Sequence, residues 1–196
     1  MQLLSLSNAM LAVCIVVPIA AVLLIFVIWY IATKNKLISL RNDMEESFST
    51  MDVHMKKRYD LIPNLVETCK GYAKHESETL ARVTQARNNA MSASRNEKAA
   101  AEQELSSSLK MLMNMVHEAY PQLKADSQFN NLSKQLEQIE HEIAQSRKYY
   151  NAKVKLINNK IEQFPSSFVA NRMRLQRYHY FELDDVSERV NPKVSF

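Results

Sequence analysis

The sequence predicts an all-α protein in which an N-terminal transmembrane helix precedes an up-and-down antiparallel four-helix bundle. Only one glycine and five prolines occur in 196 residues, too few for the many turns of a β-rich fold. Residues 9–32 form an uninterrupted apolar run. Beyond this run, apolar residues recur at steps of three and four, as on one face of an α-helix. We therefore expect an anchor over residues 1–33, a bundle over 34–165, and a short helix with a tail over 166–196.

The anchor runs from Ala9 to Ala32. At about 1.5 Å per residue it spans roughly 36 Å, enough to cross a ~30 Å hydrocarbon core. Trp29 and Tyr30 close the run, where aromatic rings favour the lipid–water interface. A cleaved signal peptide is the competing interpretation, but residues 1–8 carry no Lys or Arg and the apolar run is too long.

Basic residues near the anchor predict its orientation. Lys34, Lys36 and Arg41 follow the span, and no Lys or Arg precedes it. The positive-inside rule then places the N-terminus outside and the C-terminal domain in the cytoplasm, as a single-pass protein of the inner cell membrane.

The first bundle helix is expected over 34–61, continuous with the anchor, and the second over 63–91. Pro63 cannot donate the backbone hydrogen bond of a continuing helix. It either reverses the chain, which gives the four-helix bundle, or only kinks one long helix, which gives a three-helix bundle; both remain open. Arg58 is expected on the solvated flank with two lysines. The apolar stripe of the two helices comprises Leu37, Leu40, Met44, Phe48, Met51, Met55, Tyr59, Ile62, Leu65, Val66, Cys69, Tyr72, Ala73, Leu80 and Val83.

The third helix is expected over 95–120, ended by Pro121, with Ser94 and Glu97 at capping-box spacing. Asp126 is a good N-cap for the fourth and longest helix. The fourth helix carries a nearly heptad stripe of Phe129, Leu132, Leu136, Ile139, Ile143, Tyr150, Val154, Ile157, Ile161 and Phe164.

Sulfur-containing side chains are predicted to be structural. Cys14 lies in the apolar run and Cys69 on an apolar stripe, so we expect buried thiols and no disulfide. Met111, Met113 and Met115 more often fill gaps in a core at such spacings; an adaptable binding surface is the alternative.

Several segments carry a family resemblance. The run RYDLIPNLVET at 58–68, followed by KGYAKHE at 70–76, resembles the signature of the LemA family. Matching segments follow in order: AYPQLKAD at 119–126, SRKYYN at 146–151, FPS at 164–166 and PKVSF at 192–196. Phe48 stands where the family usually has tryptophan, and the segment 174–177 lacks the usual glycine, which leaves its turn geometry open. The resemblance implies a single-pass membrane protein with a helical bundle, and no established activity comes with it.

No catalytic constellation is found in the sequence. None of the five histidines follows a glutamate by three residues, so the di-iron pattern of helical bundles is missing. Gly71 is the single glycine, which excludes phosphate-binding loops. We therefore predict no catalytic residue, no metal and no cofactor, and a protein that is not an enzyme. The formal net charge of +4 lacks a basic stripe interleaved with aromatics, so nucleic acid is not an expected partner.

The C-terminal tail has two interpretations. It either folds back over the bundle or frays, or it docks on a partner or a lipid surface. The residues proposed for partner contact are Arg172, Arg174, Arg177, Tyr178, Tyr180, Phe181, Val194 and Phe196.

These observations favour a membrane-anchored scaffold or adaptor that acts through protein–protein contacts. The alternative is a membrane-tethered sensor that binds a small ligand between helices, in a pocket lined by Tyr149, Tyr150 or the methionines. The expected partners are membrane lipid and another protein or a second copy of the chain.

Overall fold

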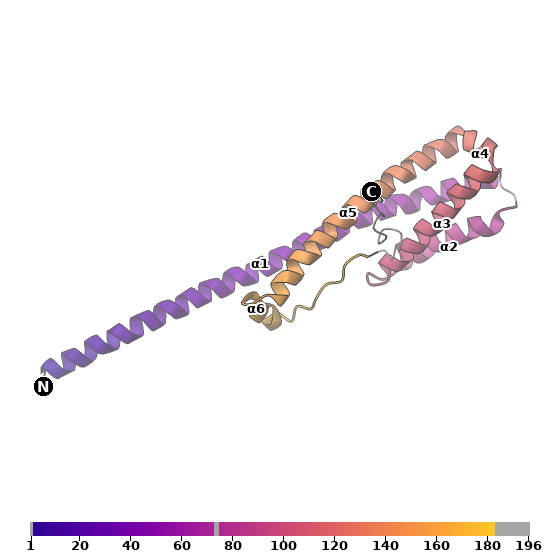
Figure 1. Cartoon of the computed structure of the whole chain (residues 1–196). Coiled ribbons are helices and arrows are strands. Elements are labelled where there is room, and N and C mark those ends of the chain that lie inside the picture. The colour runs from indigo at the N-terminus through magenta and orange to yellow at the C-terminus, as the bar shows by residue number, and fades with distance from the viewer. Residues whose placement is uncertain (1, 73–74, 183–196) are drawn as a thin grey trace, which may run out of the picture. The chain divides into compact units, whose positions relative to one another are not determined.

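The computed structural model describes residues 2–72 and 75–182, with side chains described from residue 16 onward. Within these residues the chain is helical and contains no strand, which confirms the all-α class. Figure 1 shows the helices α1 (Gln2–Lys70), α2 (Ser77–Ser92), α3 (Lys98–Ala119), α4 (Pro121–Ala125), α5 (Ser127–Glu162) and α6 (Ser166–Arg172).

Helix α1 is long and apolar enough to cross a membrane. The apolar side chains from Val16 to Ile31 are almost all exposed, so the protein itself does not cover them. Of the predicted anchor residues, Trp29 and Tyr30 are half-buried and Ala32 is exposed. Ala9 lies in α1, and its side chain is outside the described ones.

Of the two alternatives at Pro63, the one in which the chain reverses there is wrong, because α1 continues through this residue to Lys70. In a regular helix the backbone N–H of residue 63 would donate to the carbonyl of Tyr59, and proline has no N–H. Arg87 of α2 supplies the missing donor, with its Nε 2.7 Å from the Tyr59 carbonyl oxygen. A side chain from a neighbouring helix thus replaces the lost backbone bond.

The reversal instead follows the end of α1 at Lys70 and precedes the start of α2 at Ser77. Gly71, the single glycine of the chain, is the first residue past α1. The alternative of one helix continuous through Pro63 is therefore correct at the proline, but this helix ends at Lys70. α2 is a separate helix that runs back along α1 (Figure 1). The continuity of the anchor with the first bundle helix is confirmed.

The chain forms two compact units. The first comprises residues up to Met44 together with Lys155–Tyr178. Its core joins α1, the end of α5 and α6 through Leu37, Leu40, Met44, Ile157, Ile161, Val169 and Ala170, all buried. The Phe164–Pro165 peptide bond between α5 and α6 is cis.

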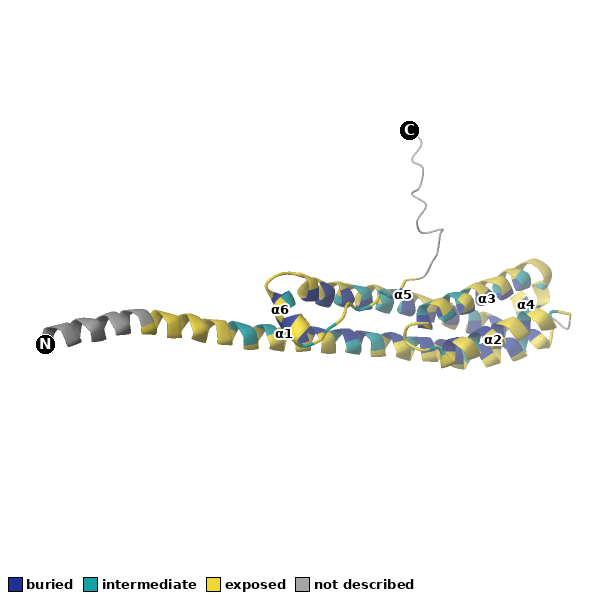
Figure 2. Ribbon diagram, turned by 90° about the horizontal axis from the view of Figure 1, so that it is seen from below, coloured by how far each residue is buried: buried dark blue, intermediate teal, exposed yellow. Residues whose placement is uncertain are grey.

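The second unit comprises Glu45–Val154 and the segment from His179, described as far as Glu182. At one end Arg95, in the α2–α3 loop, pairs with Glu45 of α1 at 2.8 Å. At the other, the Tyr72 hydroxyl lies 3.1 Å from Asp126, next to α5. Successive long helices of this unit therefore run in alternate directions, and Figure 2 shows buried residues recurring along each of them. Tyr72 is 45% exposed, so its predicted place on the apolar stripe is wrong; Ala73 lies outside the described residues.

The helix starts in this unit differ in how they are capped. Asp126 caps α5 as predicted, accepting a hydrogen bond from the Phe129 N–H at 2.9 Å. The Ser94 hydroxyl instead donates to the Glu97 carboxylate at 2.6 Å and α3 begins at Lys98, so the predicted capping box is wrong.

Candidate functional site

A buried ion cluster lies at the centre of the second unit. Arg58 of α1 is only 1% exposed, and its guanidinium pairs with Glu102 of α3 and Glu140 of α5. Its Nη1 also donates to the Ser106 hydroxyl at 2.9 Å. A buried charge needs such partners because desolvation of an unpaired ion is costly. The expected flank position of Arg58 is therefore wrong.

Two further polar groups complete this cluster. The Tyr59 hydroxyl donates to Glu102, and the buried Lys98 ammonium donates to the Ala90 carbonyl at 2.9 Å. Burial raises the pKa of Glu102, opposed by the charge of Arg58 and the Tyr59 hydrogen bond. Burial, reinforced by the hydrogen bond to Glu102, raises the pKa of Tyr59. Tyr59 therefore keeps its proton and remains a donor at neutral pH.

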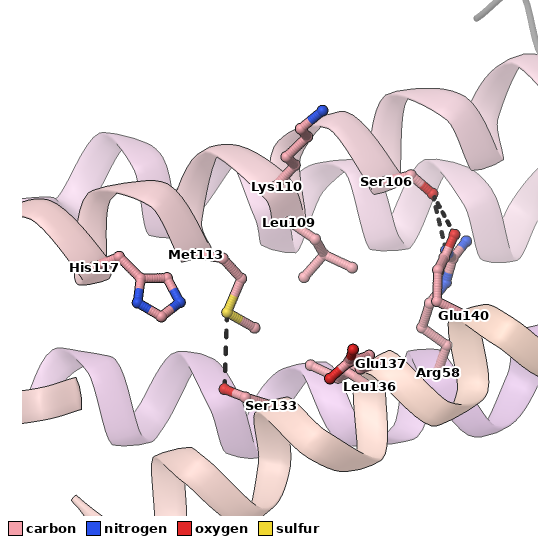
Figure 3. A pocket seen from close by; sticks show the side chains of 10 residues that line it. All are labelled: Arg58, Ser106, Leu109, Lys110, Met113, His117, Ser133, Leu136, Glu137 and Glu140. Carbon is pink, nitrogen blue, oxygen red and sulfur yellow. Dashed lines mark hydrogen bonds and ion pairs between the residues drawn. The ribbon is translucent and has the colours of Figure 1, made fainter. Parts of the chain in front are cut away.

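A groove of about 420 Å³ opens between α3 and α5 and ends at this cluster (Figure 3). Leu109, Met113 and Leu136 supply its apolar surface. Arg58 lies at one end together with Glu140, whose side chain is 48% exposed. The other residues that line the α3–α5 groove are Ser106, Lys110, His117, Ser133 and Glu137. The arrangement suits an amphipathic group, because it combines apolar walls with a charged end at Arg58 and Glu140.

The three α3 methionines lie outside the core. Met111 is 47% exposed, and Met113 and Met115 are half-buried. Met111 and Met115 line a second hollow of about 590 Å³ on α3. The core face of α3 is occupied by Leu105, Leu109, Leu112 and Val116. Met111 follows Leu109 by two residues, and residues two apart on a helix point to different faces. The core interpretation of Met111 is therefore wrong. Met111 and Met115 are four residues apart and share one face of α3, which we call the methionine face; their hollow shares Lys110 with the α3–α5 groove, which Met113 lines.

The predicted contact residues of the tail are partly engaged within the chain. In the first unit, Asn158 of α5 holds the backbone of Tyr178 through two hydrogen bonds of 2.9 Å. In the second unit, Asn151 holds the backbone of Phe181 at 2.8 and 3.1 Å, and the Phe181 side chain is buried. The described tail thus folds back on α5 at these residues.

The remaining tail residues differ in exposure. Arg172, Arg174 and Arg177 are exposed, with Arg177 3.6 Å from Glu162, and Tyr180 is half-buried. Val194 and Phe196 lie outside the described residues. A partner role for the tail stays a prediction.

Cys69 is a buried free thiol, and burial raises its pKa to about 11. A thiol of this kind is a poor nucleophile, which confirms the structural interpretation. Across residues 2–72 and 75–182 no group of three or more His, Cys, Asp or Glu side chains is placed to hold a metal ion. That the protein is not an enzyme stays a prediction.

Comparison with known proteins now assigns the family. The sequence pattern of the LemA family matches residues 47–196. The chain belongs to the LemA family. It is also similar to Protein LemA of Metamycoplasma hominis, with 27% identity over 172 residues, which cover 87% of this chain and 78% of the relative.

The LemA-like segments meet one another in the structure. Tyr72 of the second segment bonds to Asp126 of the third, and Tyr120 of the third donates to Glu76 of the second at 3.2 Å. The first segment supplies Arg58 and Tyr59 of the buried cluster. Residues of the LemA-like segments therefore make contacts between different helices of the second unit.

Phe48, the departure from the usual LemA tryptophan, keeps an aromatic contact. Its ring lies 5.6 Å from that of Tyr150, edge to face, and the Arg95 guanidinium sits 4.1 Å above it. An aromatic ring of either kind can make both contacts.

Sequence reasoning missed the buried cluster, although the sequence carries a signal for it. Arg58 continues the 3–4 spacing of Met51, Met55 and Ile62. Glu102 likewise extends the α3 stripe that begins at Leu105. Two opposite charges at core positions of neighbouring helices indicate a buried ion pair.

Proposed function

We propose that this LemA protein is a non-catalytic, membrane-anchored adaptor of the bacterial inner membrane. Helix α1 crosses the bilayer, and the second unit binds a partner protein, or a second copy of the chain, in the cytoplasm. The observation that carries the proposal is the methionine face beside the α3–α5 groove. It is an apolar surface that the described part of the chain leaves open.

Several features support a protein partner at this place. Methionine side chains are unbranched and polarizable, so they adapt to the shape of a bound surface. A groove between two helices with apolar walls fits the side chains of an amphipathic helix. Lys110, His117 and Glu137 are exposed at the groove and offer polar contacts around an apolar centre.

Site-specific photo-crosslinking in cells tests the adaptor role. A benzophenone amino acid replaces Met111 in one variant and Val53 in the control. Val53 is 55% exposed on α1 and not among the residues that line the groove. We expect one discrete adduct from position 111 and none from position 53. Adding Met115→Glu should abolish this adduct, because the new charge would be desolvated at the contact.

The identity of the adduct then decides between forms of the proposal. A different protein supports an adaptor, and a second copy of the chain supports a homo-oligomeric scaffold. Equal labelling from both positions, or no adduct from Met111, would contradict the proposal.

A second candidate function is a sensor of a small amphipathic anion. It is favoured by the position of Arg58 at the end of the groove, where the half-exposed Glu140 is its replaceable partner. Native mass spectrometry of the chain extracted from membranes should then show a retained small ligand. Leu136→Trp, which fills the groove, should release it, whereas a ligand-free native chain contradicts this candidate.

A further inference from the structure

A pocket of about 310 Å³ lies in the first unit, where the α5–α6 turn meets α1. Trp29 and Lys36 line it from α1, and Lys160 and Phe164 line it from the end of α5 and the turn. The apolar, exposed run of α1 ends at this level. The pocket therefore adjoins the last turns of the segment that crosses the membrane in the proposed function.

The α5–α6 turn, taken together with the first residues of α6, carries apolar side chains that the first unit does not cover. Phe164 is 89% exposed and Phe168 is 59% exposed. Their neighbours Ile161 and Val169 are buried in the core of the unit. Ile161 and Val169 thus fix both sides of the turn to the core. Phe164 and Phe168 can therefore contact a surface outside the protein. Aromatic rings beside a membrane helix favour the lipid–water interface.

The charge of the pocket agrees with an anionic surface. Lys36 and Lys160 are both exposed, and no side chain that lines the pocket is acidic. Lysines at the interface attract the phosphates of anionic lipids.

We infer that the α5–α6 turn is a second membrane contact beside the anchor. Phe164 and Phe168 enter the interface, and the pocket takes the phosphate of an anionic phospholipid between Lys36 and Lys160. A phospholipid suits the site better than free phosphate, because it fills the apolar and the cationic surfaces together. The inference rests on the proposed membrane crossing by α1.

Tryptophan fluorescence of the full chain in lipid vesicles tests the depth of the turn. Trp29 is the sole tryptophan, so the native chain reports on the anchor. Trp29→Phe combined with Phe164→Trp reports on the turn. Trp29→Phe combined with Leu156→Trp is the control, because Leu156 is 50% exposed and lies on α5 about 9 Å before the helix ends at Glu162. The quencher is phosphatidylcholine brominated near the top of its acyl chains.

We expect the fluorescence of the native chain and of the Phe164→Trp variant to be quenched to a similar degree. Quenching of the Leu156→Trp control should be several-fold weaker. If Trp29 is quenched and Phe164→Trp behaves like Leu156→Trp, the membrane contact of the turn is overturned, whereas the membrane crossing by α1 is supported. A protein, rather than lipid, would then cover the turn. Without quenching of Trp29, the membrane crossing itself fails.

A second measurement tests the lysines. The bromine label is placed either on phosphatidylglycerol or on phosphatidylcholine in vesicles of equal composition, and quenching of Trp29 is compared. Brominated phosphatidylglycerol should quench Trp29 about twofold more strongly than brominated phosphatidylcholine. This preference should vanish in the double variant Lys36→Gln/Lys160→Gln. The matched control is Lys148→Gln/Lys155→Gln, which removes the same charge elsewhere on α5. An absent preference, or equal loss in the control, overturns the lipid-phosphate site.

Discussion

Arg174 holds the backbone conformation in which a glycine would be expected. Its φ is 55°, and it closes α6 with two hydrogen bonds, Arg174 N–H to Asn171 and Leu175 N–H to Ala170, at 3.0 and 3.1 Å. These are the two bonds of a Schellman motif, whose left-handed position favours glycine. The usual LemA glycine of this segment is missing, and the arginine adopts the turn at a cost of about 1 kcal/mol.

Arg174→Gly should therefore raise the free energy of unfolding by about 1 kcal/mol. Urea unfolding of the detergent-solubilised chain, followed by circular dichroism, measures the change. Arg172→Gly is the matched control, because Arg172 is still helical; it should lower stability by about 0.5–1 kcal/mol. A lower unfolding midpoint for Arg174→Gly would contradict the argument.

Asp126 makes stability depend on pH. The hydrogen bond from Phe129 N–H, followed by the one from the Tyr72 hydroxyl, lowers its pKa below the ordinary 3.8. A lowered folded pKa gives stability that is fully present above the unfolded pKa and is lost as pH falls through the folded pKa. The advantage of the native chain over Asp126→Asn should therefore shrink on acidification below about pH 5.

Urea unfolding midpoints at a series of pH values measure this difference. Asparagine can still cap the helix but cannot ionise, so the comparison isolates the charge. Tyr72→Phe removes one of the hydrogen bonds to Asp126, so the pH-dependent part of the stability difference should be smaller in that background. A difference that stays constant down to about pH 2 would exclude Asp126 as its source.

At the scale of the element, Arg87 stabilises α1 where Pro63 interrupts its hydrogen bonds. Arg87→Met should lower the free energy of unfolding by about 1.5–3 kcal/mol, because the Tyr59 carbonyl loses a charged donor. Pro63→Ala restores a backbone N–H at that point, so Arg87→Met should cost less in this background. A double-mutant cycle by urea unfolding measures the coupling. Equal costs in both backgrounds would show that the two residues act independently.

The boundaries of α1 show which element signals were informative. Apolar spacing continues in phase through Met55, Tyr59, Ile62, Val66 and Cys69, which indicates an unbroken helix. The prediction gave the proline more weight than this pattern. The donor that replaces the missing N–H of Pro63 belongs to Arg87, which lies 24 residues away in sequence. A tertiary contact of this kind is not visible to local rules. Gly71, the first residue past α1, was the correct sign of the helix end, because glycine is a poor helix former.

The packed helices were more predictable than the site. The stripe residues of α5 from Phe129 to Ile161 are buried as predicted, whereas Phe164 is exposed. The α3–α5 groove depends on the space left between two helices after packing, and sequence periodicity does not determine that volume. The same holds for the pocket beside Trp29, because it joins residues more than a hundred positions apart.

At the scale of the whole molecule, the orientation of α1 decides which compartment the second unit occupies. Lys34, Lys36 and Arg41 follow the apolar run, and basic residues remain on the cytoplasmic side during insertion. Trypsin added to sealed inside-out vesicles should therefore digest the domain, for instance after the exposed Arg177. Right-side-out vesicles should protect it until detergent is added.

Reversing the charge bias tests the cause of this orientation. Lys34→Gln and Arg41→Gln remove two basic residues after the span, and Ser5→Lys and Ser7→Lys add two before it. Because the bias of Lys and Arg across the first span sets its direction, the combined variant should insert in both orientations. Part of the domain should then be digested in right-side-out vesicles. Unchanged protection would mean that folding of the domain before insertion, rather than charge, fixes the side. Digestion of the native domain only from the outer face would place the adaptor surface outside the cell.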